Sequence, residues 1–173
     1  MKKWLLSFLA ALLFFAFILP LFLPNKYSVE RSIVINKSRD DVYSKIINLE
    51  AWPEWSPWNA MDPEAEYQVV GPEGVVGTFS TWKGEKIGSG KQTLTQLVDP
   101  ELVVFAIEFH EPQQGLAQSS FTLSETENGT NVTWAIQGEL TYPLERYFGL
   151  MMDSMLGKEF EKGLSSLKAN LEQ

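Results

Sequence analysis

The chain contains no cysteine among its 173 residues. This absence excludes a disulfide framework, a thiol nucleophile and a thiolate metal site. A single histidine, His110, leaves a zinc site without its usual ligands, although carboxylates alone can still bind calcium or magnesium. No stretch of the sequence combines residues into a recognisable ligand set. We therefore expect no cofactor and no metal site.

Basic residues are also scarce. Lysine and arginine number 14 against 22 aspartates and glutamates, which gives a formal net charge of −8. Proteins that bind nucleic acids usually present basic surfaces to the phosphates. The charge balance therefore argues against a nucleic-acid partner.

Motifs for catalysis are missing as well. No serine lies in a Gly-x-Ser-x-Gly elbow, and the one histidine ends a predicted strand. Alternation along that strand places His110 and Glu108 on the face away from the core, where a solvated pair is a simpler interpretation than an acid–base couple. The sequence predicts no catalytic residue.

The first 24 residues differ from the rest in being almost entirely apolar. Residues 4–23 carry no charge and are interrupted only by Ser7 and Pro20, which is long enough for a transmembrane helix. Lys2 and Lys3 precede this run, so the positive-inside rule places the N-terminus in the cytoplasm and the domain outside it, which is the periplasm if the source is a Gram-negative bacterium. A cleaved signal peptide is the alternative, but the run is long and lacks a small-x-small site. We expect an anchor over 1–24 and one domain over 25–173.

A strand and a helix open this domain. Residues 27–36 alternate between apolar and polar side chains, which predicts a first strand. Ser38 follows with acidic residues at 40 and 41, a helix N-terminal signature, so we expect a helix over about 39–48.

Three tryptophans lie in the next segment, which reads AWPEWSPW over residues 51–58. Trp52 and Trp55 share a face if a short helical turn forms, and Pro57 is expected to end that turn. The rings either plug the end of a core or line the mouth of a pocket.

Six further strands follow, separated by glycine or proline turns: 65–70, 76–83, 86–97, 102–110, 116–125 and 130–141. Short turns between strands predict an antiparallel meander. Each strand is apolar on one side only, as in a sheet that helices cover on one face.

The chain ends in a predicted amphipathic helix over residues 144–171. Its later part has an apolar face that includes Leu156, Phe160 and Leu164, whereas its earlier stripe lies about a third of a turn away. One straight helix does not bury both stripes against one surface, so a kink or break is expected between 153 and 158, most simply at Gly157. The earlier, methionine-rich segment would then be either a lid over a cavity or a well-filled part of the core.

Four stretches of the domain carry a family resemblance: 52–58, Trp82-Lys83-Gly84 with Gly88-Ser89-Gly90, 130–134 and 157–164. With the order of elements, they resemble the START-like superfamily, and most of all its polyketide cyclase/dehydrase group, usually labelled SRPBCC. The resemblance covers about 27–172 and implies an α+β helix-grip fold: strand, two short helices, six-stranded antiparallel meander and long C-terminal helix, here preceded by one transmembrane helix. None of the four stretches is a catalytic signature.

The resemblance also implies a cavity between the curved sheet and the last helix, for a hydrophobic small molecule or lipid. The expected lining is largely apolar, with Gln92 and Ser119 as polar exceptions. The expected ligand-binding residues are Trp58, Trp82, Gln92, Phe105, Phe109, Phe121, Trp134, Phe148, Met151, Met152 and Met155. These rings either line an open cavity or fill it.

Three functions are compatible with this pattern. The first is membrane-anchored binding of a hydrophobic small molecule or lipid. The second is a cyclase- or dehydrase-like enzyme that uses polar cavity residues such as Gln92. The third is a ligand-free module that meets a protein partner through its tryptophan segment.

Overall fold

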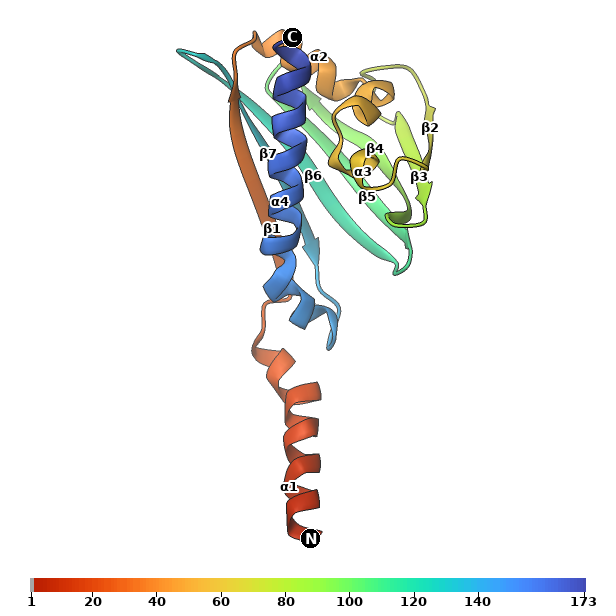
Figure 1. Cartoon of the computed structure of the whole chain (residues 1–173), viewed down its shortest axis with the longest axis vertical. Coiled ribbons are helices and arrows are strands. Elements are labelled where there is room, and N and C mark those ends of the chain that lie inside the picture. The colour runs from red at the N-terminus through yellow and green to blue at the C-terminus, as the bar shows by residue number, and fades with distance from the viewer. Residues whose placement is uncertain (1) are drawn as a thin grey trace.

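The computed structural model describes residues 2–173, with an elongated N-terminal segment attached to an α+β domain (Figure 1). The segment comprises α1 (Lys2–Leu13), a π-helical stretch η1 (Phe14–Ile18) and a 3-10 stretch η2 (Leu19–Phe22). In the described part of the chain, no helix is both long and apolar enough to cross a membrane. The single transmembrane helix expected over residues 4–23 is therefore not supported.

Pro20 gives a physical reason for the break in regular helix. Proline has no backbone N–H, so it cannot donate to the carbonyl four residues earlier, and its ring crowds that carbonyl. The regular α-helix ends at Leu13, and the backbone reaches Pro20 through π-helical turns and then tightens into a 3-10 helix. The sequence prediction rested on the length of the apolar run and did not include the effect of Pro20 on the helix hydrogen bonds.

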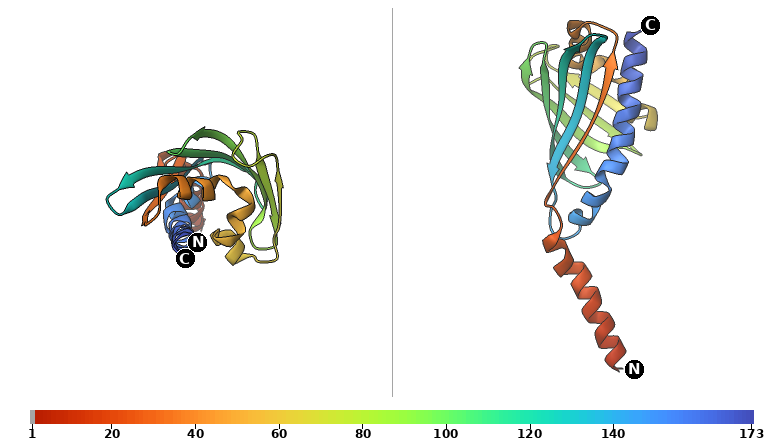
Figure 2. Two further views of the ribbon diagram at one scale, coloured as in Figure 1. Left: turned by 90° about the horizontal axis from the view of Figure 1, so that it is seen from above. Right: turned by 90° about the vertical axis from the view of Figure 1, so that its left-hand side faces the viewer.

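The domain is built on a seven-stranded antiparallel sheet with strand order β1-β7-β6-β5-β4-β3-β2. The strands are β1 (Lys26–Ile35), β2 (Glu66–Val70), β3 (Phe79–Gly84), β4 (Gly88–Val98), β5 (Leu102–Glu111), β6 (Gly115–Thr126) and β7 (Gly129–Glu139). The predicted meander is confirmed, and the first strand pairs with the last one. Figure 2 shows the sheet curving around the helices.

Short helices connect β1 to the meander: α2 (Arg39–Ile47), η3 (Leu49–Glu54) and α3 (Pro57–Met61). The predicted cap is present, since the backbone N–H of Asp41 donates to the Ser38 hydroxyl at 3.1 Å. Pro57 does not simply end the preceding turn, as expected, because it also begins α3 as the first-turn proline.

Aromatic side chains fill the core beneath α2 and η3. Trp55, Phe105 and Phe121 are at most 1% exposed, and Trp134 stacks on Phe160 of the last helix with ring centroids 4.1 Å apart. Trp52 belongs to the same cluster and donates its indole N–H to the Ile46 carbonyl at 2.8 Å. The interpretation of Trp52 and Trp55 as core residues is confirmed.

The last helix, α4 (Glu145–Leu171), is one uninterrupted α-helix of 27 residues that lies along β1 and touches β7. The break expected between 153 and 158 is not present. Its later face is buried as predicted, through Phe160, Leu164 and Leu167. The helix needs no break because it leaves most of the earlier stripe outside the core.

That earlier stripe divides in the structure: Tyr147 and Met152 are partly buried, whereas Phe148, Met151, Met155 and Leu144, the N-cap of α4, are 52–68% exposed. Met155 and Phe160 are five residues apart, which at 3.6 residues per turn places them about 140° apart around the helix. The four exposed side chains therefore face away from the buried side of α4, whereas Met152 packs against the core.

Candidate functional site

The concave face of the sheet divides into a filled half and an accessible half. Inward-facing residues near the α2 end, such as Leu94, Phe105 and Phe121, are buried. Further along the same face the inward-facing positions are only partly covered, although the apolar ones pack against the core. These partly covered residues are Trp82 (β3), Gln92 (β4), Phe109 (β5), Ala117 (β6) and Tyr27 (β1).

Helices frame this accessible half. Met152 and Leu156 of α4 and Trp58 of α3 are also partly buried and pack against the core cluster. The accessible half is thus a largely apolar surface between α3, α4 and the ends of β1 and of β3 to β6. We call it the concave site.

The expected ligand-binding residues fall into three groups in the structure. Trp58, Trp82, Gln92, Phe109 and Met152 lie at the concave site. Phe105, Phe121 and Trp134 are 0–3% exposed in the aromatic core. Phe148, Met151 and Met155 lie on the outer face of α4 and are exposed.

The two polar residues expected in the lining differ in their surroundings. The Ser119 hydroxyl accepts from the Trp134 indole N–H at 3.0 Å and donates to the Ala135 carbonyl at 3.1 Å. Its hydrogen bonds are therefore made within the core. The Gln92 side chain is half-buried on the inward face, and within residues 2–173 no hydrogen bond to its amide is found. Gln92 therefore remains available to a bound molecule.

A second polar group at the concave site is Tyr27, which sequence analysis did not select. Its ring lies against Gly138 of the neighbouring strand, where an added Cβ would come within 2.8 Å of the phenol oxygen. Burial and the negative charge of Glu145 both raise the pKa of Tyr27. The phenol is therefore held in its protonated form, as a donor.

Glu145, at the start of α4, accepts hydrogen bonds from two loops. Its carboxylate accepts from the backbone N–H of Thr141 at 2.5 Å and from the side-chain amide of Gln113. Gln113 lies in the loop between β5 and β6, so this contact joins that loop to the first turn of α4.

Two surface hollows lie outside the space beneath α4. One, of about 450 Å³, is a polar hollow around the N-terminus of α2. The other, of about 380 Å³, lies at the open end of the β5–β6 hairpin and includes Phe109 and His110. His110 is exposed, and Glu108 pairs with Lys91 at 3.0 Å, as expected for a surface strand face. Among residues 2–173 no group of three or more potential metal ligands is found.

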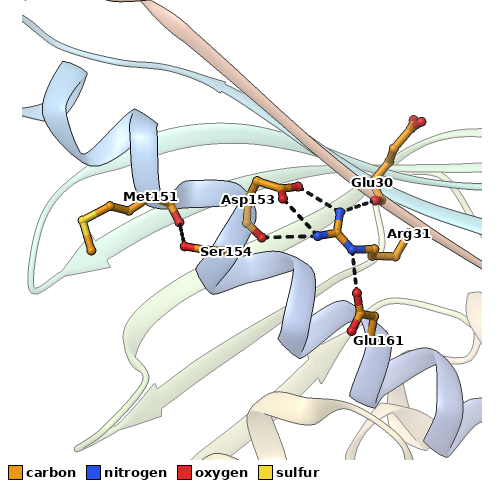
Figure 3. Close-up of polar contacts among 6 residues, drawn as sticks. All are labelled: Glu30, Arg31, Met151, Asp153, Ser154 and Glu161. Carbon is orange, nitrogen blue, oxygen red and sulfur yellow. Dashed lines mark hydrogen bonds and ion pairs between the residues drawn. The ribbon is translucent and has the colours of Figure 1, made fainter.

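Arg31 of β1 fastens the middle of α4 to the sheet (Figure 3). Its guanidinium forms a two-pronged ion pair with Asp153, at 2.9 and 3.1 Å, and donates through Nε to Glu161 at 2.8 Å. Nη1 also donates to the Glu30 carbonyl at 2.7 Å. The hydrogen bonds from Arg31 lower the pKa of Asp153. We call Arg31, Asp153 and Glu161 the Arg31 clamp.

Gly157 makes room for this clamp. It lies between Asp153 and Glu161 at intervals of four residues, and a Cβ added there would be 2.0 Å from Nη2 of Arg31. Sequence analysis noted Gly157 as a break and missed the clamp. Two signals were present: an arginine at an inward strand position, and two carboxylates flanking a glycine on one helix face.

Comparison with solved structures supports the fold. The di-domain ARO/CYC StfQ from the steffimycin biosynthetic pathway has a TM-score of 0.68 and 11% identity, and the match covers 85% of this chain and 51% of that one. The Aha1 dimer from Colwellia psychrerythraea gives 0.60 and 20%, with 84% and 96% covered. Protein CV1439 from Chromobacterium violaceum gives 0.58 and 18%, with 87% and 99% covered. At these identities the likeness concerns the helix-grip fold alone.

Comparison with curated proteins gives no match. The sequence model of one family, described as polyketide cyclase / dehydrase and lipid transport, matches residues 26–172, which is nearly the whole domain. The chain therefore belongs to the polyketide cyclase/dehydrase and lipid transport family.

Proposed function

We propose that this protein binds a hydrophobic small molecule or lipid at the concave site. One observation carries the proposal: inward-facing apolar side chains that the fold itself leaves half-covered, among them Trp82, Phe109 and Met152. Elsewhere on the same face the aromatic core is packed shut, so the exposure is local. A ligand that covers this apolar surface removes it from water, which is favourable by about 25 cal/mol per Å² of buried area.

The description of the family as one of cyclases, dehydrases and lipid transport proteins agrees with a ligand of this class. Gln92 and the Tyr27 phenol supply the few polar groups that fix the orientation of an apolar ligand. The proposal extends to residues 4–23, which would attach the domain to a membrane and keep the concave site near a source of lipid. Lys2 and Lys3 would then remain on the cytoplasmic side, with the domain on the other.

Native mass spectrometry of the full chain tests the binding proposal, followed by solvent extraction of the bound material. A matched pair of variants on β6 makes the test specific. Ala117→Phe places a ring into the concave site, whereas Gln118→Phe places the same ring on the exposed opposite face. Thermal unfolding of both variants reports whether each one folds.

We expect the wild type and Gln118→Phe to retain an extractable apolar molecule, or to take one up from added lipid extract, and Ala117→Phe to lose it. An apo mass in every form, with no uptake from the extract, would overturn the proposal. Equal retention by a folded Ala117→Phe variant would place the ligand elsewhere.

A cyclase-like enzyme is the second candidate, because Gln92 and Tyr27 both present polar groups at the concave site. Such an enzyme would use the same apolar surface to hold a reactive chain and the two polar groups to orient it. Gln92→Leu separates the two functions. In a carrier it changes affinity alone, whereas in an enzyme it removes turnover of a bound polyketide substrate.

A further inference from the structure

The outer face of α4 presents a stripe that neither the fold nor the concave site uses. Leu144, Phe148, Met151 and Met155 are 68, 56, 52 and 57% exposed. Their spacing of four, three and four residues aligns them along one side of the helix. Figure 3 shows the Met151 side chain pointing away from Arg31.

This stripe continues the apolar surface of the N-terminal segment. The Tyr142 hydroxyl donates to the Phe17 carbonyl at 2.6 Å, and Nη1 of Arg146 donates to the Pro20 carbonyl at 2.9 Å. The Arg146 guanidinium also lies 5.6 Å from the centre of the Tyr142 ring. These contacts hold the first turn of α4 next to the end of the N-terminal segment, as Figure 1 shows.

The distribution of apolar side chains favours lipid over a protein partner. A protein partner covers one side of a helix, but Leu150 is 65% exposed on a different side of α4 from Met151. Around the N-terminal segment the exposed apolar residues also occur on all sides, among them Trp4, Leu6, Phe8, Leu9, Phe15 and Phe17. A helix that is apolar all round belongs in an apolar medium.

Charge changes where the stripe ends. Lys158 and Lys162 follow Met155 by three and seven residues, so they continue the same outer face, and both are exposed. Lys162 is also paired with Glu159 at 2.7 Å. Lysines that flank an apolar stripe place their ammonium groups at the level of lipid phosphates while their stems cover apolar surface.

We propose that the outer face of the first half of α4, from Leu144 to Met155, is a second contact with a lipid bilayer, continuous with residues 4–23. Lys158 and Lys162 mark its border with water. This inference rests on the membrane attachment in the proposed function, and it adds that α4 itself touches the lipid. The concave site, on the other side of the same helix, then opens next to the bilayer surface.

The absence of cysteine makes the test direct, since a single introduced cysteine is the sole labelling site. Full-length variants Phe148→Cys, Met151→Cys and Met155→Cys are labelled with a small fluorophore. They are reconstituted into vesicles of phosphatidylcholine and phosphatidylglycerol whose acyl chains carry bromine as a quencher. Leu9→Cys reports on the N-terminal segment, and Ser165→Cys reports on α4 beyond the lysines.

We expect quenching at 9, 148, 151 and 155, with fluorescence at 165 unchanged. Quenching at 9 alone would overturn the α4 contact and leave the membrane attachment intact. No quenching at any position would overturn both. Spin labels at 151 that broaden one another in dilute vesicles, without lipid quenching, would show that a second copy covers the stripe, which also overturns the proposal.

Discussion

At the scale of single residues, Gly157 and Arg31 form a close contact between α4 and β1. Alanine is normally preferred to glycine inside a helix by about 1 kcal/mol. Here the added methyl would lie 2.0 Å from Nη2 of Arg31, so the guanidinium must leave its two carboxylates or the helix must shift. The steric conflict therefore lowers the stability of a Gly157→Ala variant, whereas the helix propensity of alanine raises it.

We expect Gly157→Ala to destabilise the protein by up to about 1 kcal/mol, because the guanidinium has to leave its ion pairs with two exposed carboxylates. In an Arg31→Ala background the same change should become neutral or stabilising, because the obstruction is gone and helix propensity remains. Chemical denaturation of the four proteins in this cycle measures both values. Stabilisation of the otherwise unchanged protein by Gly157→Ala would disprove the account of the clamp.

The Arg31 clamp also predicts a dependence on pH. Arg31 lowers the pKa of Asp153 from its ordinary value of 3.8 by hydrogen bonding to the ionised carboxylate. The unfolded chain then binds the proton more readily than the folded one, so stability rises with pH across this window. The contribution is complete above about pH 4 and is lost as the pH falls through the lowered pKa.

Comparison of the wild type with Asp153→Asn measures this contribution. The wild type should be the more stable of the two at neutral pH, and the difference should shrink below pH 3.8. Both carboxylates of the clamp are well exposed, at 68 and 61%, so the effect will be modest and will weaken with salt. A difference that is constant with pH would contradict the assignment.

At the scale of elements, α4 contains two halves with different roles. Phe160 is 1% exposed and stacks on Trp134, whereas Phe148 is 56% exposed on the outer stripe. Both belong to one continuous helix, so helix propensity is matched between them. The pair therefore isolates the effect of burial.

Phe160→Ala should lower the free energy of unfolding by about 3–5 kcal/mol, the range for loss of a buried aromatic side chain. Phe148→Ala should change it by no more than about 0.5 kcal/mol. Denaturant unfolding by tryptophan fluorescence gives both values. Comparable losses would mean that the outer stripe is packed in the folded protein.

The difference between these halves explains what sequence could predict. Period-two alternation and glycine or proline turns determined all seven strands, and the capping by Ser38 located α2, because these signals are local. The phase change along α4 was also a real signal. Its interpretation failed because the side on which a stripe lies depends on where the helix rests, and α4 rests along β1 at one edge of the sheet.

The concave site was predictable in part, because the alternation along each strand is a local signal. Alternation correctly placed Trp82, Gln92 and Phe109 on the inward face. It could not separate them from Phe105 and Phe121, which have the same pattern but lie beneath the tryptophans of the connecting segment. Coverage is a property of tertiary packing, and no periodicity in one strand encodes it.

At the scale of the whole molecule, two hydrogen bonds decide how the N-terminal segment is oriented against the domain. Arg146 donates to the carbonyl of Pro20, and Tyr142 donates to that of Phe17. Phe17 lies in η1 and Pro20 in η2, where the Pro20 carbonyl also accepts from the backbone N–H of Leu23 at 3.3 Å. The irregular turns thus carry the two carbonyls through which the segment contacts the domain.

We expect Arg146→Ala to loosen this orientation, because it removes the guanidinium from both the Pro20 carbonyl and the Tyr142 ring. Tyr142→Phe is the matched control, since it deletes one hydroxyl and keeps the ring. Spin labels on Phe15→Cys and Ser165→Cys, in the full chain in phosphatidylcholine and phosphatidylglycerol vesicles, report the distance distribution between segment and domain. The distribution should broaden most in Arg146→Ala and less in Tyr142→Phe. An unchanged width in Arg146→Ala would mean that the linking residues 23–25, rather than these contacts, determine the orientation in which α4 and the N-terminal segment meet the bilayer.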